Sequence, residues 1–460
     1  MNLRSRLFQA KTNVKVEKKT EGVAVEPMDT IQEHPRLEIQ TLNEQEIEYK
    51  DVLHKKLLDV LDLPLIASID PKEARKQISK ICESVLNDQS FPVNYNTRQL
   101  LIEKVNDEIL GLGPLEPLLK EPTVSDILVN GPKKIFVERF GRLEAVNIKF
   151  NNNAHLLKII DRIVVNVGRR IDESSPLVDA RLPDGSRVNA IIPPLALDGA
   201  ALSIRRFSVD KLNLDDLVSK RSISEQMAEV FEAIVKIRKN ILISGGTGSG
   251  KTTMLNAMSN YIPENERIVT IEDSAELQLQ QEHIVRLETR PANIEGKGTI
   301  TQRDLLKNAL RMRPDRIVVG EVRGEEAFDM LQAMNTGHDG SLTTIHANTP
   351  RDSLARVENM VSMAGYDLPA RTIRNQIASA IDVVLQLERQ QDGNRRVTSM
   401  TEISGMEGEV ITMSEIFKFV RTGLSEEGKV LGHFKATGIV PRFFETFKQF
   451  GIDLNIEVFN

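Results

Sequence analysis

The sequence has little that could cross-link or stack: one cysteine, no tryptophan and only 4% aromatic residues. A single cysteine excludes an intrachain disulfide framework and favours a reducing compartment. Cys82 lies in an amphipathic run with Ile78, Ile81 and Val85, so we expect a buried, unreactive thiol.

Long apolar runs are absent as well, because no stretch approaches the roughly 18 consecutive apolar residues of a membrane span. The N-terminus is basic but lacks the apolar core of a signal peptide. We therefore expect a cytoplasmic protein that associates with a membrane only peripherally, through partners.

The charge balance is mildly acidic, with 60 basic and 66 acidic side chains and a net charge of −6. Nucleic-acid binders usually carry the opposite sign, and few aromatic side chains are available to stack on bases. The composition thus argues against a nucleic-acid partner. Hydrophobic residues make up 40% of the 460 residues, which suffices for the cores of about two to four domains.

Changes in hydrophobic period divide the chain into five predicted parts. The N-terminus shows no period, a helical period follows, then a period of two, and then alternating strands and helices. The predicted parts are a flexible tail at 1–45, a helical bundle at 46–121, an α+β domain at 122–220, an α/β domain at 221–390 and a C-terminal extension at 391–460.

Short apolar segments in the second half of the chain predict a parallel sheet, since helical segments separate them. In the α+β part, Asp184-Gly185 stands between two extended segments and predicts a hairpin with a type I′ turn, which needs positive φ. Ser222 and Glu225 fit a capping box at the start of a helix. The expected parallel strands are 240–244, 267–272, 316–320, 341–346 and 382–387.

One motif carries specific chemistry: residues 245–252 fit the phosphate-binding pattern G-x-x-x-x-G-K-[ST] in full. Its glycines let backbone N–H groups point at phosphate oxygens. Lys251 would reach the β- and γ-phosphates, and the Thr252 hydroxyl would ligate Mg²⁺. We predict that a nucleotide binds at Gly245, Gly246, Thr247, Gly248, Ser249, Gly250, Lys251, Thr252 and Thr253.

Acidic and histidine residues follow other predicted strands at their carboxyl ends, where parallel sheets bind ligands. Glu272 and Asp273 follow one strand and Glu321 follows another, so these carboxylates should face the phosphates and position Mg²⁺ or water. His346 ends a third strand, where it could hydrogen-bond the γ-phosphate. The alternatives are an acidic helix cap or loop charge, and a structural histidine.

Together these motifs resemble the secretion ATPase superfamily of type II and type IV systems. The superfamily pattern is a Walker A loop, an aspartate box, a Walker B segment that ends in Gly-Glu, and a histidine box. In this sequence they correspond to Gly245–Thr252, 270–273, 317–321 and the segment from His338 to His346.

Within that superfamily, the sequence is most similar to the tight-adherence (Tad/Flp) pilus assembly ATPases of the CpaF/TadA type. The resemblance covers about 70–440. It includes the segments 113–119, 180–187, 311–316 and 402–408.

The resemblance implies a RecA-like P-loop ATPase domain, preceded by an α+β (PAS-like) domain and a helical bundle, in a homohexamer with ATP at subunit interfaces. It implies that Glu321 orients or deprotonates the attacking water and that Glu272 lies near the metal. Mg²⁺ would then be held by Thr252, Glu272 and Glu321. His346 would act on the nucleotide, and His338 would bind it or hold the histidine box in shape.

Arginine fingers of this family come from the domain before the ATPase domain. The candidates here are Arg181, Arg187, Arg205 and Arg206, each of which could instead be a solvated strand charge. Arg323, two residues after Glu321, could couple subunits.

The resemblance also implies that MgATP hydrolysis powers pilus assembly at the bacterial inner membrane, through platform proteins of that membrane. A type IV secretion ATPase that moves protein or DNA is the alternative, and a nucleotide-gated scaffold without hydrolysis is another. Because Cys82 is the only cysteine, the four-cysteine zinc module of some type II relatives is absent, and we expect no zinc.

Overall fold

The computed structural model describes residues 42–61, 66, 69–88, 91–139, 141–207, 212–292 and 297–460. They belong to one compact unit that spans 40–460. The flexible tail predicted at 1–45 lies almost entirely outside the described residues. Among the described helices, none is both long and apolar enough to cross a membrane.

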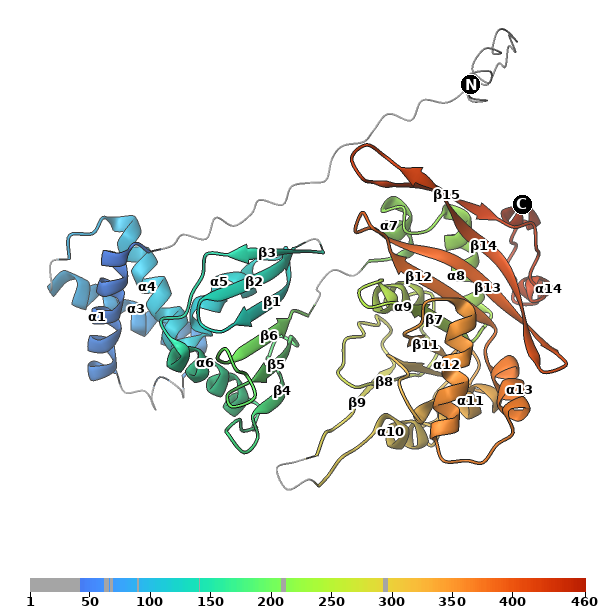
Figure 1. Cartoon of the computed structure of the whole chain (residues 1–460), viewed down its shortest axis with the longest axis horizontal. Helices are drawn as coiled ribbons and strands as arrows, with labels where there is room; N and C mark the ends of the chain where they lie inside the picture. Colours follow the sequence, from blue (N-terminus) through green and yellow to red (C-terminus); the bar gives the residue numbers. More distant parts are fainter. Residues whose placement is uncertain are drawn as a thin grey trace, which may run out of the picture. The chain divides into compact units, whose positions relative to one another are not determined.

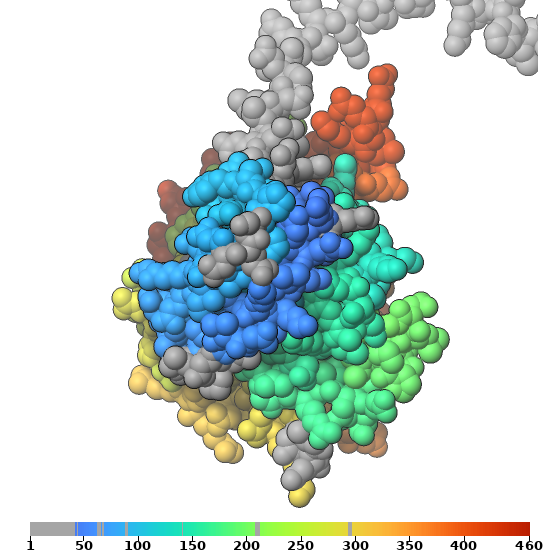
Figure 2. All heavy atoms as spheres, turned by 90° about the vertical axis from the view of Figure 1, so that its left-hand side faces the viewer, coloured from blue at the N-terminus to red at the C-terminus, as the bar shows by residue number. Residues whose placement is uncertain are grey.

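Helices form a small bundle at the start of the described chain: α1 (Glu44–Val60), α3 (Pro71–Asp88) and α4 (Tyr95–Leu110). Figure 2 shows one face of this bundle in blue. Apolar side chains at helical spacing, among them Leu53, Ile78 and Leu101, are fully buried in its core. Cys82 lies in the same core, where burial raises the pKa of the thiol to about 12. The expectation of a buried, unreactive thiol is confirmed.

The next part is an antiparallel sheet, as the period of two predicts, with α6 (Asn153–Asn166) packed against it (Figure 1). Its strand order is β3-β2-β1-β6-β5-β4. Short helices η1 (Gly113–Leu115) and α5 (Glu116–Lys120) lead into it. The strands are β1 (Val124–Asn130), β2 (Lys134–Arg139), β3 (Arg142–Val146), β4 (Leu177–Arg181), β5 (Arg187–Ile191) and β6 (Ala201–Arg205).

The hairpin predicted at Asp184-Gly185 is present, but its turn is not type I′. β4 and β5 pair up to Arg181 and Arg187, so the loop runs from 182 to 186. Gly185 has φ +91°, whereas Asp184 has no positive φ, and a type I′ turn needs both. Asp184 instead accepts hydrogen bonds from Ser186 N and Oγ, at 2.9 and 2.8 Å, which stabilise a longer loop.

A nine-stranded sheet organises the rest of the described chain, in the order β15-β14-β13-β12-β7-β11-β10-β8-β9. From β12 to β9 the strands are parallel, and from β12 to β15 they are antiparallel. The strands are β7 (Ile241–Gly245), β8 (Ile268–Glu272), β9 (Ile284–Glu288), β10 (Arg316–Val319), β11 (Leu342–Ile345), β12 (Val383–Arg389), β13 (Arg395–Glu407), β14 (Val410–Leu424) and β15 (Val430–Ala436).

Helices cover both faces of this sheet (Figure 1), and two apolar cores lie on its two sides. The central strands β7 and β8 are consequently buried at every residue, as expected of a parallel sheet. The helices are α7 (Leu214–Ser219), α8 (Glu225–Lys236), α9 (Lys251–Ser259), α10 (Gln302–Ala309), α11 (Glu326–Asn335), α12 (Pro350–Met363), α13 (Ala370–Ala380), α14 (Phe444–Gln449) and η2 (Ile456–Phe459).

The five predicted parallel strands are confirmed as β7, β8, β10, β11 and β12. β9 escaped prediction because this edge strand is only half-buried. The sheet also continues across residue 390 into β13, β14 and β15. The prediction of a capping box at Ser222 and Glu225 is wrong. Ser224 caps α8 instead, by accepting a hydrogen bond from Met227 N at 3.2 Å.

Candidate functional site

The phosphate-binding loop follows β7 and opens α9, as its sequence pattern predicts. Gly248 and Gly250 have φ of +69° and +96°, a conformation that glycine adopts without strain. A Cβ atom at Gly245 would lie 2.5 Å from both Leu387 O and Ser249 Oγ. The path of the loop beside β12 therefore depends on glycine at these positions.

Lys251 is folded back into the loop and is only 8% exposed. Its Nζ donates to Gly245 O at 3.0 Å and to Gly246 O at 2.9 Å, and lies 3.5 Å from His346 Nε2. Burial lowers the pKa of Lys251, while the nearby carboxylate of Glu321 opposes that shift. The ammonium group is thus desolvated and donates to carbonyl oxygens of its own loop. Phosphate oxygens could take the place of these carbonyl oxygens as acceptors.

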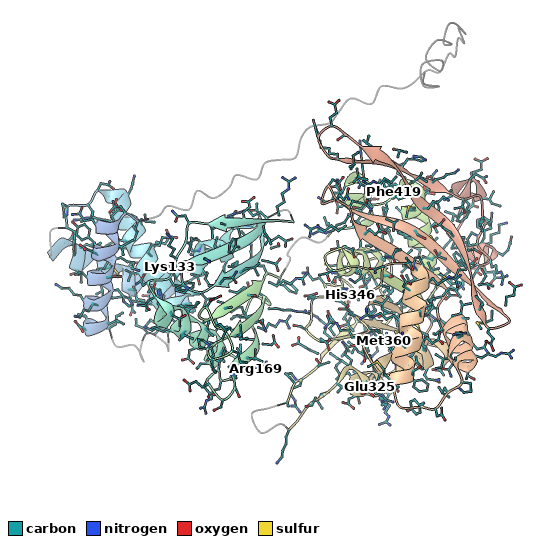
Figure 3. The ribbon with its side chains drawn as sticks, in the orientation of Figure 1. Lys133, Arg169, Glu325, His346, Met360 and Phe419 are labelled. Carbon is teal, nitrogen blue, oxygen red and sulfur yellow. The ribbon has the colours of Figure 1, made fainter. Side chains whose placement is uncertain are left out.

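The parallel strands bring the predicted acidic and histidine residues to one edge of the sheet. β10 lies between β8 and β11, and β11 lies beside β7. Glu272, Glu321 and His346 therefore come from neighbouring strand ends on the side where the phosphate-binding loop begins. Figure 3 labels His346 in this part of the molecule.

Glu321 is the centre of a charged network. Its Oε2 lies 2.6 Å from Arg323 Nη2, and its Oε1 lies 2.8 Å from His346 Nε2. Arg323 also reaches Asp273, at 3.4 Å, so both partners of this predicted coupling residue belong to its own chain. Burial, followed by the charge of Lys251, lowers the pKa of His346 and favours a neutral imidazole near pH 7.

Glu272 is the most deeply buried acid of the edge, 3% exposed. Its Oε2 accepts hydrogen bonds from Glu276 N and Leu277 N, at 2.7 and 2.9 Å, while its Oε1 has no partner among the described residues. Burial raises the pKa of this carboxyl to about 7. A Cβ atom at Gly320 would lie 2.9 Å from Glu272 Cγ, so the glycine before Glu321 makes room for this side chain.

A cavity of about 600 Å³ joins these groups. Thr252, Glu272 and Glu321 supply hard oxygen donors to it, the type that Mg²⁺ prefers. The unpartnered Oε1 of Glu272 fits a nearby cation as well. Among the described residues, no group of three or more acidic, histidine or cysteine side chains could hold a metal ion alone. The lining also includes Thr247, Gly248, Ser249, Gly250, Lys251, Thr253 and His346.

The four candidate arginine fingers differ in whether they line the cavity and in which groups they contact. Arg187 and Arg205 line the cavity, and Arg187 also donates to Ser274 O at 2.7 Å. Arg206 lines it too, but its guanidinium donates to Glu121 O and Val124 O of its own domain. Arg181 does not line this cavity and pairs instead with Glu288 at 2.6 Å. The geometry therefore favours Arg187 and Arg205 over the other two.

His338, predicted as a nucleotide contact, lies at the opposite edge of the sheet. It precedes β11, whereas His346 follows it, and β11 runs parallel to β7. The side chain does not line the cavity, and the carbonyl of His338 accepts a hydrogen bond from Ser341 Oγ at 2.9 Å. One strand length separates the two histidines, so the structure does not bring His338 to this cavity.

Among the cavity residues that were not predicted are two arginines, Arg389 at the end of β12 and Arg395 at the start of β13. No local motif marks them. The strand expected at 382–387 could have indicated them. Because it belongs to the same parallel sheet as the strand before the phosphate-binding loop, the residues that follow it should lie near that loop.

The chain is similar to known proteins over this region. A family model described as "Type II/IV secretion system protein" matches residues 108–419. A putative conjugal transfer protein of Mycobacterium tuberculosis is 40% identical over 309 residues, which cover 66% of this chain and 87% of that protein. The type IV secretion system protein VirB11 of Bartonella quintana is 32% identical over 351 residues, covering 67% of this chain and 96% of that protein.

Among solved structures, the VirB11 ATPase of the Brucella suis type IV secretion system, in complex with sulphate, is 28% identical. The match covers 63% of this chain and 95% of that chain, with a TM-score of 0.34. The family model spans more than half of this chain, including the phosphate-binding loop, Glu272, Glu321 and His346. The chain therefore belongs to the type II/IV secretion system protein family and is an ATP-hydrolysing enzyme.

Proposed function

We propose that the chain forms a homohexameric ring that hydrolyses MgATP and powers assembly of a Tad/Flp (type IV-like) pilus at the bacterial inner membrane. The ring would lie in the cytoplasm and reach the membrane through platform proteins. The observation that carries the proposal is the position of Glu321, which shares a cavity with Lys251 and contacts His346. A phosphate-binding loop needs such a carboxylate to hydrolyse what it binds.

The contacts of Lys251 and Glu321 indicate how nucleotide binding would prepare the reaction. Lys251 would leave the carbonyl groups of Gly245 and Gly246 for phosphate oxygens, since charge-assisted bonds to phosphate are stronger. Arg323 neutralises Glu321, and the neutral imidazole of His346 lies 2.8 Å from the same carboxylate. Phosphates that attract Arg323 would free Glu321 to orient or deprotonate water.

Thr252, with Glu272 nearby, would hold Mg²⁺, which when bound neutralises charge on the phosphates. From the preceding domain, Arg187 and Arg205 would stabilise charge on the γ-phosphate as fingers. In this proposal each subunit has five parts: a tail at 1–45, a helical bundle at 46–121, a PAS-like α+β domain at 122–220, the ATPase domain at 221–390 and a C-terminal extension at 391–460.

The sequence segments that resemble Tad/Flp ATPases support a role in pilus assembly. One of these segments, 180–187, contains Arg181 and Arg187. The alternative is a ring that moves protein or DNA in type IV secretion. The relatives named as conjugal transfer and VirB11 proteins favour that alternative.

Steady-state phosphate release from ATP by the full chain tests the proposal. We expect turnover that Lys251→Ala abolishes, and a higher rate on vesicles that carry the inner-membrane platform proteins of a Tad system. Added DNA should leave the rate unchanged. Stimulation by DNA without stimulation by platform proteins would favour the secretion alternative. If no condition gave phosphate release, the chain would instead be a nucleotide-gated scaffold that does not hydrolyse ATP.

A further inference from the structure

The β12–β13 hairpin places two arginines opposite each other above the phosphate-binding loop. β12 runs parallel to β7 with Leu387 opposite Gly245, so its last residues extend past the end of β7. The chain then turns and returns as β13, which makes Arg389 and Arg395 direct cross-strand partners. Like charges in that position destabilise a strand pair, so something must offset the repulsion.

Both arginines lie against the loop. Arg395 Nε donates to Gly248 O at 2.8 Å, and a Cβ atom at Gly250 would lie 3.3 Å from Arg395 Cδ. A Cβ atom at Gly248 would lie 3.6 Å from Arg389 Nη1. Arg389 Nη2 donates to Gly141 O. Both residues line the 600 Å³ cavity together with Lys251.

The charge around the pair is unbalanced. Among the described residues, neither arginine forms an ion pair with a carboxylate. Burial, then Arg389, lowers the pKa of Arg395; Arg205 acts in the same direction and Glu138 against it. Lys251 lines the same cavity, as do the carboxylates of Glu138, Glu272 and Glu321.

The next residue along β13 shows what a structural arginine looks like here. Arg396 contacts Asp392 at 3.5 Å and stacks over Phe419 at 5.1 Å from the ring centre. Arg396 thus has a carboxylate and an aromatic ring as partners, whereas Arg389 and Arg395 line the cavity and donate to backbone carbonyl groups. That contrast between adjacent residues indicates a ligand carrying several negative charges.

We propose that Arg389 and Arg395 form a cationic wall, supplied by the same subunit as the phosphate-binding loop, that binds the phosphate chain of the nucleotide. The proposal rests on the proposed function in one respect, namely that Lys251 and its loop bind a nucleoside triphosphate. It assigns the β12–β13 hairpin to ligand binding, and it adds two phosphate contacts that the family motifs do not include.

Displacement of a fluorescent ADP analogue by ATP and by tripolyphosphate tests this wall. Arg389→Ala and Arg395→Ala should each weaken both competitors about tenfold, the size of one charge-assisted hydrogen bond, and the double variant more. Arg395→Lys should stay within about threefold of wild type, and Arg395→Gln should behave as Arg395→Ala, because the charge and not the bond to Gly248 O carries the effect. Arg421→Ala is the matched control, since that arginine donates to Gln391 Oε1 at 3.1 Å, outside the cavity.

Three results would overturn the wall: unchanged tripolyphosphate affinity in both alanine variants, weakened ATP binding without weakened tripolyphosphate binding, or rescue by glutamine but not lysine. The last would mean that Arg395 only supports the loop. Melting temperatures equal to that of Arg421→Ala show that the variants fold. If Lys251→Ala also bound ATP with wild-type affinity, the proposed function itself would fail. If Lys251→Ala lost affinity while the Arg389 and Arg395 variants kept it, only the cationic wall would be refuted.

Discussion

The two edges of the parallel sheet use buried polar groups in opposite ways. At the amino edge, Asn240 accepts hydrogen bonds from Gly340 N and Ser341 N, at 2.9 and 3.0 Å, and donates to Ala380 O at 2.7 Å. At the carboxyl edge, Glu272 Oε1 lacks a partner and Lys251 bonds to carbonyl groups of its own loop. The side chain of Asn240 has its partners within the fold, whereas Glu272 and Lys251 keep polar groups that a ligand could engage.

The charged groups show the same difference. Arg316, at the amino edge, is fully buried and pairs with Glu266 at 2.5 Å. At the carboxyl edge, the partly exposed Glu321 contacts the cation of Arg323 and the imidazole of His346, which a ligand could draw away. The comparison teaches that burial does not identify a functional residue in this fold. A charged group that lines the cavity without a fixed partner for its charge or its oxygen does so better.

The largest effect should come from Glu321→Gln. We expect turnover to fall about 10³-fold, as for loss of a group that positions or deprotonates water, while ATP affinity stays near that of wild type. Phosphate release and equilibrium ATP binding measure the two quantities. Glu325→Gln, at an exposed carboxylate that pairs with Arg303, should change neither. Normal turnover in Glu321→Gln would refute its catalytic role.

Asn240→Ala tests the opposite edge. Removing the amide leaves Gly340 N, Ser341 N and Ala380 O without their partner, so the folded state should lose about 3 kcal/mol. Thermal unfolding would show the loss, while turnover measured well below the melting temperature should stay within about twofold. Asn308→Ala, at an exposed position, should change stability by less than about 0.5 kcal/mol. A selective loss of turnover in Asn240→Ala would erase the distinction between the edges.

Glu272→Gln should change how stability depends on pH. The folded pKa of about 7 lies above the ordinary value of 4.5, so the unfolded chain loses this proton first as pH rises. Folding stability is therefore lost through that window, by roughly 2–3 kcal/mol between pH 5 and 8. Glutamine does not titrate, so the nucleotide-free variant should gain melting temperature relative to wild type at pH 8. Glu282→Gln, on the surface, should show no such trend, and a flat difference for Glu272→Gln would count against the raised pKa.

The two histidines that flank β11 give the smallest expected effect and the most direct contrast. His346→Ala should lower turnover about 30-fold, because it removes a contact with Glu321 and a neighbour of Lys251. His338→Ala should leave turnover within about twofold, since His338 does not line the cavity. Equal losses in both variants would contradict the division between edges.

The parallel strands and the phosphate-binding loop could be predicted because their signals are local. Glycines at 245, 248 and 250 and short apolar runs need no knowledge of distant residues. The positions of Glu272, Glu321 and His346 followed from one rule about strand ends. The division of the candidate arginines could not be predicted, since only the fold shows that Arg206 donates to carbonyl groups of its own domain.

Other features depend on register, which one sequence does not reveal. Arg389 and Arg395 face the cavity because Leu387 pairs with Gly245 across strands about 140 residues apart in sequence. The hairpin at Asp184 and the cap of α8 differ from expectation by shifts of one or two residues, where side-chain hydrogen bonds decide.

Equilibrium binding of ATP to the full chain in the presence of Mg²⁺ tests the central claim most directly, with Lys251→Ala and His338→Ala as the paired variants. The claim is that the carboxyl edge of the parallel sheet holds the nucleotide. It predicts that Lys251→Ala weakens binding at least about 100-fold, the effect of losing a buried cation that contacts phosphates, while His338→Ala binds as wild type. Wild-type affinity in Lys251→Ala would contradict the claim.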